Sequence, residues 1–206
     1  MSSSTVKSGR PGWVIPAIII GILAVIIFFW SVNIKNSALE FSQGVSKSWG
    51  DVNTSYQRRN DLIGNLVKTV EGAANFEKST LVEVTQARAA ATQVKVDPSN
   101  ITPEKLAEFN QAQAGVSSAL SRLLVTVEAY PTLQTNQNFL KLQDELASTE
   151  NEIRTARTRY NEKVEVYNNY VLRFPNSMFL GNYKEKPYFE AVASAYKPVD
   201  VQFNIK

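Results

Sequence analysis

The stretch Gly12–Val32 constrains this chain more than any other part of the sequence, because it has no charged residue and is dominated by Ile, Val, Leu, Ala and Phe. At a helical rise of about 1.5 Å per residue it measures roughly 30 Å, which is the thickness of the hydrocarbon core of a bilayer. Trp13 and Trp30 lie near its two ends, where indole side chains favour the headgroup region. We therefore predict a transmembrane helix at residues 12–32.

A cleaved secretory signal is the alternative for this segment. Such a signal has a shorter apolar core, of about 7–15 residues, followed by a small-x-small cleavage site. The residues after Trp30 read Ser-Val-Asn-Ile-Lys and contain no such site. We therefore expect an uncleaved anchor, preceded by a disordered, serine-rich tail at residues 1–11.

The composition of the chain excludes several classes of function. Residues 33–206 are enough for one domain with a hydrophobic core. The chain has no Cys and no His, which excludes disulfides, thiol catalysis, histidine metal sites and Ser-His-Asp triads formed within it. The net charge is only +3, and basic residues are interspersed with acidic ones. The sequence therefore contains no basic stripe that would indicate a nucleic-acid partner. We expect no cofactor and no nucleic acid.

The charges that flank the span bear on its orientation. Lys7 and Arg10 precede it and Lys35 follows it, with Glu40 and Lys47 further along. Cytoplasmic flanks of membrane spans carry an excess of Lys and Arg. This slight bias predicts a cytoplasmic N-terminus and a helical domain on the extracytoplasmic or periplasmic side.

Apolar residues spaced by three, four and seven predict helices through most of the remaining chain. From Asn33 to about Val94 there is no Pro, so we expect one long helix, continuous with the anchor or kinked near one of its glycines. The turn residues Asp97-Pro98-Ser99-Asn100 end this helix.

Two further helices are predicted by their start and stop signals. The first begins at Thr102-Pro103-Glu104, which combines a capping hydroxyl, a first-turn Pro and an acidic residue, and it runs to Ala129. The second begins near Asn136 and ends before Pro175. Beyond it we expect a short helix at Tyr188–Tyr196 and an extended tail at Val199–Phe203. The predicted fold is all-α: an N-terminal transmembrane helix, an antiparallel bundle of long helices with coiled-coil-like packing, a short C-terminal helix and an extended tail.

The membrane-proximal part of the first long helix carries a regular apolar stripe. The second helix is too short to reach it if the first helix runs to Val94, so the stripe needs another cover. The candidates are a neighbouring copy, another protein, the bilayer surface and the C-terminal segment. We expect neighbouring copies, because one membrane holds identical stripes parallel and concentrated. The residues of this self-association stripe are Phe41, Val45, Trp49, Val52 and Tyr56.

Polar residues also recur on the faces of the predicted helices. We interpret them as a network that fixes helix register through partly buried hydrogen bonds and ion pairs. The alternatives are a binding groove and a catalytic carboxylate pair formed by Glu128 and Glu150. A helical di-iron site would need Glu-x-x-His, and the chain has no His. The residues of the network are Arg58, Arg59, Asp61, Glu128, Glu150, Arg157 and Asn161.

Several local motifs follow one another in a fixed order. Trp49-Gly50-Asp51-Val52 precedes the run Arg58-Arg59-Asn60-Asp61-Leu62-Ile63-Gly64-Asn65-Leu66-Val67, and Val127-Glu128-Ala129-Tyr130-Pro131 follows later. Together with Ala156-Arg157-x-x-Tyr160-Asn161 and Phe174-Pro175, these motifs resemble the LemA family of bacterial membrane proteins. The resemblance extends from about Trp49 to Phe203. It implies a single-pass anchor and an antiparallel helical domain in a bacterial membrane, and it carries over no enzyme activity.

We therefore expect a membrane-anchored helical scaffold and not an enzyme. It would self-associate and present a helical surface to membrane or envelope proteins or to the lipid bilayer. A second hypothesis is a domain that senses a ligand or signal and transmits a conformational change through the long first helix. A third is a hydrolase that uses Glu128 and Glu150.

Overall fold

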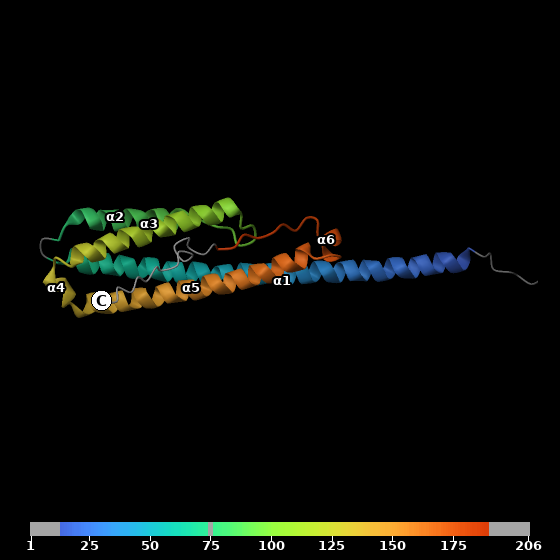
Figure 1. Cartoon of the computed structure of the whole chain (residues 1–206), viewed down its shortest axis with the longest axis horizontal. Helices are drawn as coiled ribbons and strands as arrows, with labels where there is room; N and C mark the ends of the chain where they lie inside the picture. The colour runs from blue at the N-terminus through green and yellow to red at the C-terminus, as the bar shows by residue number, and fades with distance from the viewer. Residues whose placement is uncertain (1–12, 74–75, 190–206) are drawn as a thin grey trace, which may run out of the picture.

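The computed structural model describes residues 13–73 and 76–189. Regular secondary structure in these ranges is entirely helical, which confirms the all-α prediction. Within these ranges, four long helices and two single-turn helices follow one another (Figure 1). They are α1 (Val14–Glu71), α2 (Lys78–Gln93), α3 (Pro103–Val127), α4 (Pro131–Gln134), α5 (Gln137–Leu172) and α6 (Asn176–Phe179).

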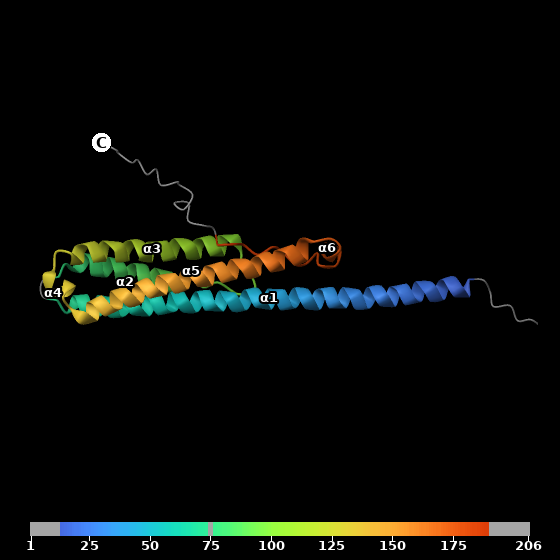
Figure 2. The ribbon, with the colours of Figure 1, turned by 60° about the horizontal axis from the view of Figure 1, so that its bottom comes forward.

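The long helices form an elongated antiparallel bundle, as predicted. Helices α1 and α3 run in one direction, and α2 and α5 run in the other (Figures 1 and 2). Helix α1 packs mainly on α5, and α2 packs mainly on α3. We call the end that contains α4 the distal end and the end that contains α6 the proximal end. The N-terminal part of α1 continues alone beyond the proximal end.

This free part of α1 contains the predicted transmembrane segment. Its apolar side chains point outward on all sides, and Ile20 and Phe29 are 67% and 66% exposed. Within the residues that the structure describes, α1 is the one helix that is long and apolar enough to cross a membrane. Helix α1 continues from this segment into the bundle without a break, so the apolar segment and the bundle share one helix of 58 residues.

The predicted long helix from Asn33 to Val94 was wrong in its second half. Helix α1 ends at Glu71 with Gly72 as its C-cap, and α2 begins at Lys78 and runs back along the bundle. No Pro marks this reversal, and the apolar spacing continues through it, so periodicity alone could not separate one helix from two.

The boundaries predicted for the two long helices that begin at Thr102-Pro103 and near Asn136 were correct within a few residues. The side chain of Thr102 accepts a hydrogen bond from the amide of Lys105 at 3.3 Å and caps α3. The side chain of Asn136 accepts hydrogen bonds from the amides of Asn138 and Phe139 and caps α5. These caps satisfy amides that would otherwise lack a partner at the start of each helix.

The predicted self-association stripe is covered within the chain, so the premise that it lacks a cover was wrong. Val45 and Val52 are fully buried, and Trp49 and Tyr56 are each 4% exposed. The partly buried Phe41 stacks edge-to-face on a tyrosine of α5. The physical reason is the reversal after Glu71, because it lets the returning helices cover the part of α1 that follows the apolar segment.

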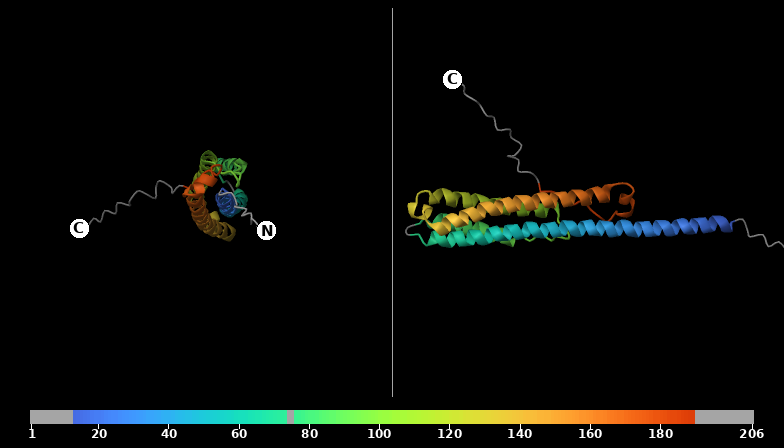
Figure 3. Two further views of the ribbon diagram at one scale, coloured as in Figure 1. Left: turned by 90° about the vertical axis from the view of Figure 1, so that its right-hand side faces the viewer. Right: turned by 90° about the horizontal axis from the view of Figure 1, so that it is seen from below.

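The lengths of α1 and α5 show why the cover is complete. Residues 34–71 of α1 measure about 57 Å and the 36 residues of α5 measure about 54 Å at the usual rise per residue. The two helices therefore lie side by side over the full bundle (Figure 3). Trp49 also packs face to face on Phe189, with ring centres 5.8 Å apart, so the C-terminal segment is part of the cover.

The C-terminal part differs from the expectation where the structure describes it. Tyr188 and Phe189, which the sequence placed in a short helix to Tyr196, lie in an extended segment instead. The rest of that predicted helix and the predicted tail Val199–Phe203 lie outside the described residues. A short helix occurs earlier, at α6.

Candidate functional site

A buried arginine of α1 lies at the centre of the bundle. Arg59 is 2% exposed, and its guanidinium donates hydrogen bonds to Glu150 Oε1 at 3.0 Å and to Gln113 Oε1 at 2.5 Å. It also donates to Ser117 Oγ at 3.2 Å and lies 4.9 Å from the ring centre of Tyr56. These contacts join α1, α3 and α5 through one side chain. The structure therefore brings together Arg59 and Glu150 of the predicted network.

The Arg59 group separates two apolar clusters of the core. The proximal cluster includes Tyr56 and Phe109, and the distal cluster includes Ile63 and Val116. Arg59 lies between these residues on α1, as does Gln113 on α3 and the fully buried Thr149 with Glu150 on α5. We call Arg59, Gln113, Thr149 and Glu150 the polar layer. The buried guanidinium of Arg59 reaches its partners on α3 and α5 in only one alignment of the helices, which is how polar residues fix register in coiled coils.

Two other members of the predicted network form ion pairs at the surface. Arg58 donates to Glu152 at 2.8 Å, between α1 and α5, and both side chains are about half exposed. Asp61 lies 3.8 Å from the guanidinium of Arg88, which joins α1 to α2. These residues flank the polar layer but face solvent.

Arg157 packs against aromatic residues of the proximal cluster. Its guanidinium is 4.6 Å from the ring centre of Phe189 and interacts with the hydroxyl of Tyr56. Burial raises the pKa of Tyr56 above its ordinary value, and the nearby charges of Arg157 and Arg59 oppose that rise. Arg157 therefore connects the edge of the polar layer to the C-terminal segment.

Asn161 and Asn168, two polar residues on one face of α5, hold the extended C-terminal segment against that helix. Asn161 donates to the carbonyl of Phe189 at 2.9 Å and accepts from its amide at 2.8 Å. Asn168 makes the same pair of bonds with Lys186, each at 2.9 Å. An asparagine side chain carries an NH2 donor group and a carbonyl acceptor, so it can bond to the carbonyl and the amide of one residue, as the backbone of a neighbouring β-strand does. We call Asn161 and Asn168 the asparagine clamp.

Two tyrosines support the clamp. The hydroxyls of Tyr160 and Tyr167 donate to the carbonyls of Pro187 and Lys184, each at 3.1 Å. Burial raises the pKa of Tyr160 and of Tyr167. The signal that could have revealed the clamp is the repeated Tyr-Asn pair seven residues apart, which recurs on one face of a helix. We missed it because the segment that it binds has no periodicity.

The buried Lys186 lies where the clamped segment meets the loop between α2 and α3. Its ammonium donates to the carbonyl of Ser99 at 3.4 Å and lies 5.4 Å from the ring centre of Tyr167. Burial lowers the pKa of Lys186, and Asp97 partly opposes this effect. The segment is therefore fixed to two sides of the bundle.

The predicted carboxylate pair is not assembled. Glu128 is exposed at the C-terminal end of α3, where its backbone carbonyl accepts from Gln134 at 2.9 Å. Along α3 it lies eleven residues, or about 16 Å, beyond Ser117. Ser117 and Glu150 both accept hydrogen bonds from the guanidinium of Arg59, so Glu128 lies far from Glu150. In residues 13–73 and 76–189, no group of acidic side chains is placed to hold a metal ion.

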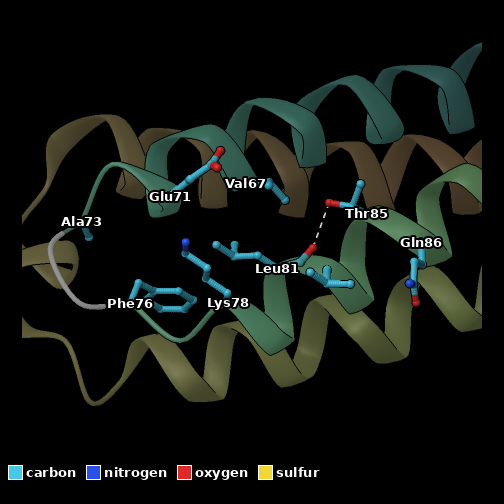
Figure 4. Close-up of a pocket in the computed structure, with 9 residues that line it drawn as sticks. Val67, Glu71, Ala73, Phe76, Lys78, Leu81, Thr85 and Gln86 are labelled. Atoms are coloured by element: carbon cyan, nitrogen blue, oxygen red, sulfur yellow. Dashed lines mark hydrogen bonds between the residues drawn. The ribbon is translucent and has the colours of Figure 1, made fainter.

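An apolar groove lies at the distal end, between α1 and α2. It has a volume of about 590 Å³. Figure 4 shows Phe76, Leu81 and Val67 among its apolar lining residues, with the side chain of Lys78 beside Phe76 and the oppositely charged Glu71 across from it. The hydroxyl of a lining threonine bonds to the helix backbone and not into the groove. This groove could not be predicted from the sequence pattern, because it depends on the reversal after α1.

Comparisons with known proteins place the chain among membrane-associated helical proteins. The family model described as LemA family matches residues 48–203. The magnetosome protein MamQ 2 of Paramagnetospirillum magneticum is 25% identical over 201 residues, which cover 88% of this chain and 74% of the relative. The magnetosome protein MamQ of Magnetospirillum gryphiswaldense is 23% identical, with coverage of 87% and 74%. The protein LemA of Metamycoplasma hominis is 24% identical over 149 residues, with coverage of 72% and 64%.

Proposed function

The chain belongs to the LemA family, and we propose that this member is a single-pass membrane scaffold. It self-associates in the membrane and presents a rigid helical rod to protein partners or to the membrane itself. The flanking charges support a location of the rod on the extracytoplasmic side of a bacterial membrane.

The observation that carries this proposal is the continuity of α1. One helix of 58 residues, about 87 Å long, includes the apolar span and one full edge of the bundle. Because α5 packs along the extramembrane part of α1, the rod cannot bend at the membrane without breaking that packing. A rigid rod with no assembled acidic site in its described part suits the positioning of partners.

The names of the relatives support a structural function. MamQ is named as a magnetosome protein, and neither its name nor the name LemA describes a reaction. We infer that the shared helical domain serves assembly in a membrane. Its partners are then membrane or envelope proteins.

Self-association now needs a surface other than the buried stripe. The membrane span offers Ala17-x-x-x-Gly21, a spacing of small residues that lets helices approach closely in lipid. A Cβ atom added at Gly21 would meet nothing within 4 Å in the single chain. That face of the span is therefore open to another copy.

The mass of the full-length protein in detergent tests this proposal. We expect a defined multimer for the native chain and a smaller species for Gly21→Ile, because the larger side chain separates the helices. Gly50→Ile is the matched control, because Gly50 also lies on α1 with open space around it but outside the span. A native monomer, or a multimer that Gly21→Ile leaves unchanged, would contradict self-association through the span.

A sensor of an apolar ligand is the second candidate function. It is favoured by the distal groove, because its volume is within the range of small-molecule sites and two of its lining residues, Val67 and Glu71, belong to α1. Val82→Trp would place an indole in the groove. If the groove is coupled to the membrane, this variant changes the amide hydrogen exchange of residues 34–45, and the control Val125→Trp does not. Equal exchange in both variants would contradict a sensor.

A further inference from the structure

Large apolar side chains lie exposed in the turn that follows α5. Leu172, Phe174 and Met178 are 55%, 75% and 71% exposed. They occur within seven residues of the chain, around the start of α6. A cluster of this kind in contact with water is unfavourable, whereas a membrane surface or a partner would cover it.

The contacts of the same turn locate it along α1. The ring of Phe179 packs edge-to-face on Trp30, with ring centres 5.7 Å apart. The hydroxyl of Tyr170 donates to the carbonyl of Ile34 at 3.4 Å. The turn therefore lies beside residues 30–34, where α1 leaves the bundle (Figures 1 and 2).

That level of α1 corresponds to the membrane interface. The charge-free span ends at Val32, and Lys35 is the first charged residue after it. Trp30 lies at the end of the span, where indoles prefer the headgroup region. A turn that packs on Trp30 is thus held at the depth of the headgroups and the upper acyl chains.

The charges of the turn also suit a lipid surface. Arg173 is exposed between Leu172 and Phe174. No acidic residue occurs from Val166 to Lys184, so nothing in this part of the sequence repels anionic headgroups. Apolar side chains next to a basic residue are typical of segments that lie in the interface.

We propose that residues 172–178, which we call the interfacial turn, insert into the surface of the leaflet that α1 enters from the bundle. The side chains of Leu172, Phe174 and Met178 contact the acyl chains, and Arg173 contacts lipid phosphate. This second membrane contact sets the rotation and tilt of the rod relative to the bilayer, which a single spanning helix leaves free. The inference rests on the membrane-spanning assignment of α1.

Depth-dependent quenching tests the insertion in the full-length protein. The chain has no Cys, so single-cysteine variants at Phe174 and Met178 can each carry an environment-sensitive fluorophore. Each protein is placed as one copy in nanodiscs of phosphatidylcholine and phosphatidylglycerol that contain lipids with a nitroxide near the headgroup. Ile26, inside the span, is the inserted control. Val166, an exposed apolar residue of α5 further from the span, is the aqueous control.

We expect the fluorophores at Phe174 and Met178 to show blue-shifted emission and to lose most of it to the nitroxide lipids, whereas the fluorophore at Val166 does neither. Met178→Glu should reduce the quenching of a fluorophore at position 174, because it places a charge in the interface. Val166→Glu should leave that quenching unchanged.

The outcomes separate this proposal from the assignment of the span. If the probe at Ile26 is quenched and those at Phe174 and Met178 behave like the probe at Val166, the interfacial turn is refuted and the span stands. If Ile26 is also unquenched, the span itself is refuted. A blue shift at Phe174 that occurs only in discs with two copies would mean that a neighbouring chain covers the turn, which also overturns the lipid contact.

Discussion

Two neighbouring arginines of α1 form ion pairs that differ mainly in burial. Arg59 and Glu150 lie 3.0 Å apart, with side chains 3% and 46% exposed, whereas Arg58 and Glu152 lie 2.8 Å apart, with side chains 53% and 40% exposed. Both pairs join α1 to α5. The second pair is therefore a control for the first at nearly constant geometry.

The expected coupling energies follow from the surroundings of each pair. Two charges about 4 Å apart attract by about 1 kcal/mol in bulk water and about 4 kcal/mol at the effective dielectric constant near a protein surface. Hydrogen bonds to charged groups contribute about 1.5–3 kcal/mol net, and exposed pairs about 0.2–1 kcal/mol. Because Glu150 is half exposed, we expect about 1.5–2 kcal/mol for Arg59 with Glu150. For Arg58 with Glu152 we expect at most about 1 kcal/mol.

Double-mutant cycles on the full-length protein in detergent measure both energies. One cycle combines Arg59→Met with Glu150→Ala, and the other combines Arg58→Met with Glu152→Ala. Urea unfolding is followed by the fluorescence of Trp49, the one tryptophan of the chain outside the predicted span.

We also expect Glu150→Ala to cost about 2–3 kcal/mol by itself, because it leaves the buried guanidinium without a carboxylate. Glu152→Ala should cost less than about 1 kcal/mol. If the two coupling energies agree within about 0.5 kcal/mol, burial does not strengthen the pair of Arg59 with Glu150, and this pair contributes no more to stability than an exposed one.

Three further predictions concern helix propensity, alkaline pH and topology. Gly50→Ala should stabilise the bundle by about 0.5–1 kcal/mol in urea unfolding, because Gly50 lies inside α1 with open space around it, and a loss of stability would contradict that environment. Burial raises the folded-state pKa of Tyr160 above its ordinary value of 10.0, so its contribution to stability is complete below pH 10.0 and is lost as the pH rises further. Tyr160→Phe should therefore lower the free energy of unfolding by about 1 kcal/mol at neutral pH, because the hydrogen bond to Pro187 is lost. Above pH 10.0 the stability of this variant should fall less steeply than that of the native chain, and parallel pH profiles would refute this. For topology, a cysteine at Asn100 should react with a membrane-impermeant thiol reagent in intact cells and one at Ser4 should not, and the opposite result would reverse the proposed orientation.

The local features of this chain could be predicted from the sequence because each depends on a few adjacent residues. Thr102-Pro103 and Asn136 mark helix starts through side-chain caps, and the structure places α3 and α5 at those residues. The charge-free span is set by composition alone. By contrast, the reversal after Glu71 follows Gly72, one of several glycines in an otherwise continuous helical pattern, so the local signal did not distinguish it. The error there led to the expectation that Trp49 and its neighbours need another copy as a cover.

Among the site residues, the sequence by itself determined which side chains could form a polar network, and only the tertiary structure decided which of them is buried. Arg58 and Arg59 are adjacent and chemically identical, but successive residues of an α-helix point about 100° apart, so one faces solvent and the other enters the core. Likewise, the side chains of Asn161 and Asn168 can bond to the backbone of any residue, and only the fold decides that their partners are Phe189 and Lys186. Caps, spans and periodic faces are short-range properties of the chain. Burial and pairing are long-range properties, because they depend on which segments return to lie beside them.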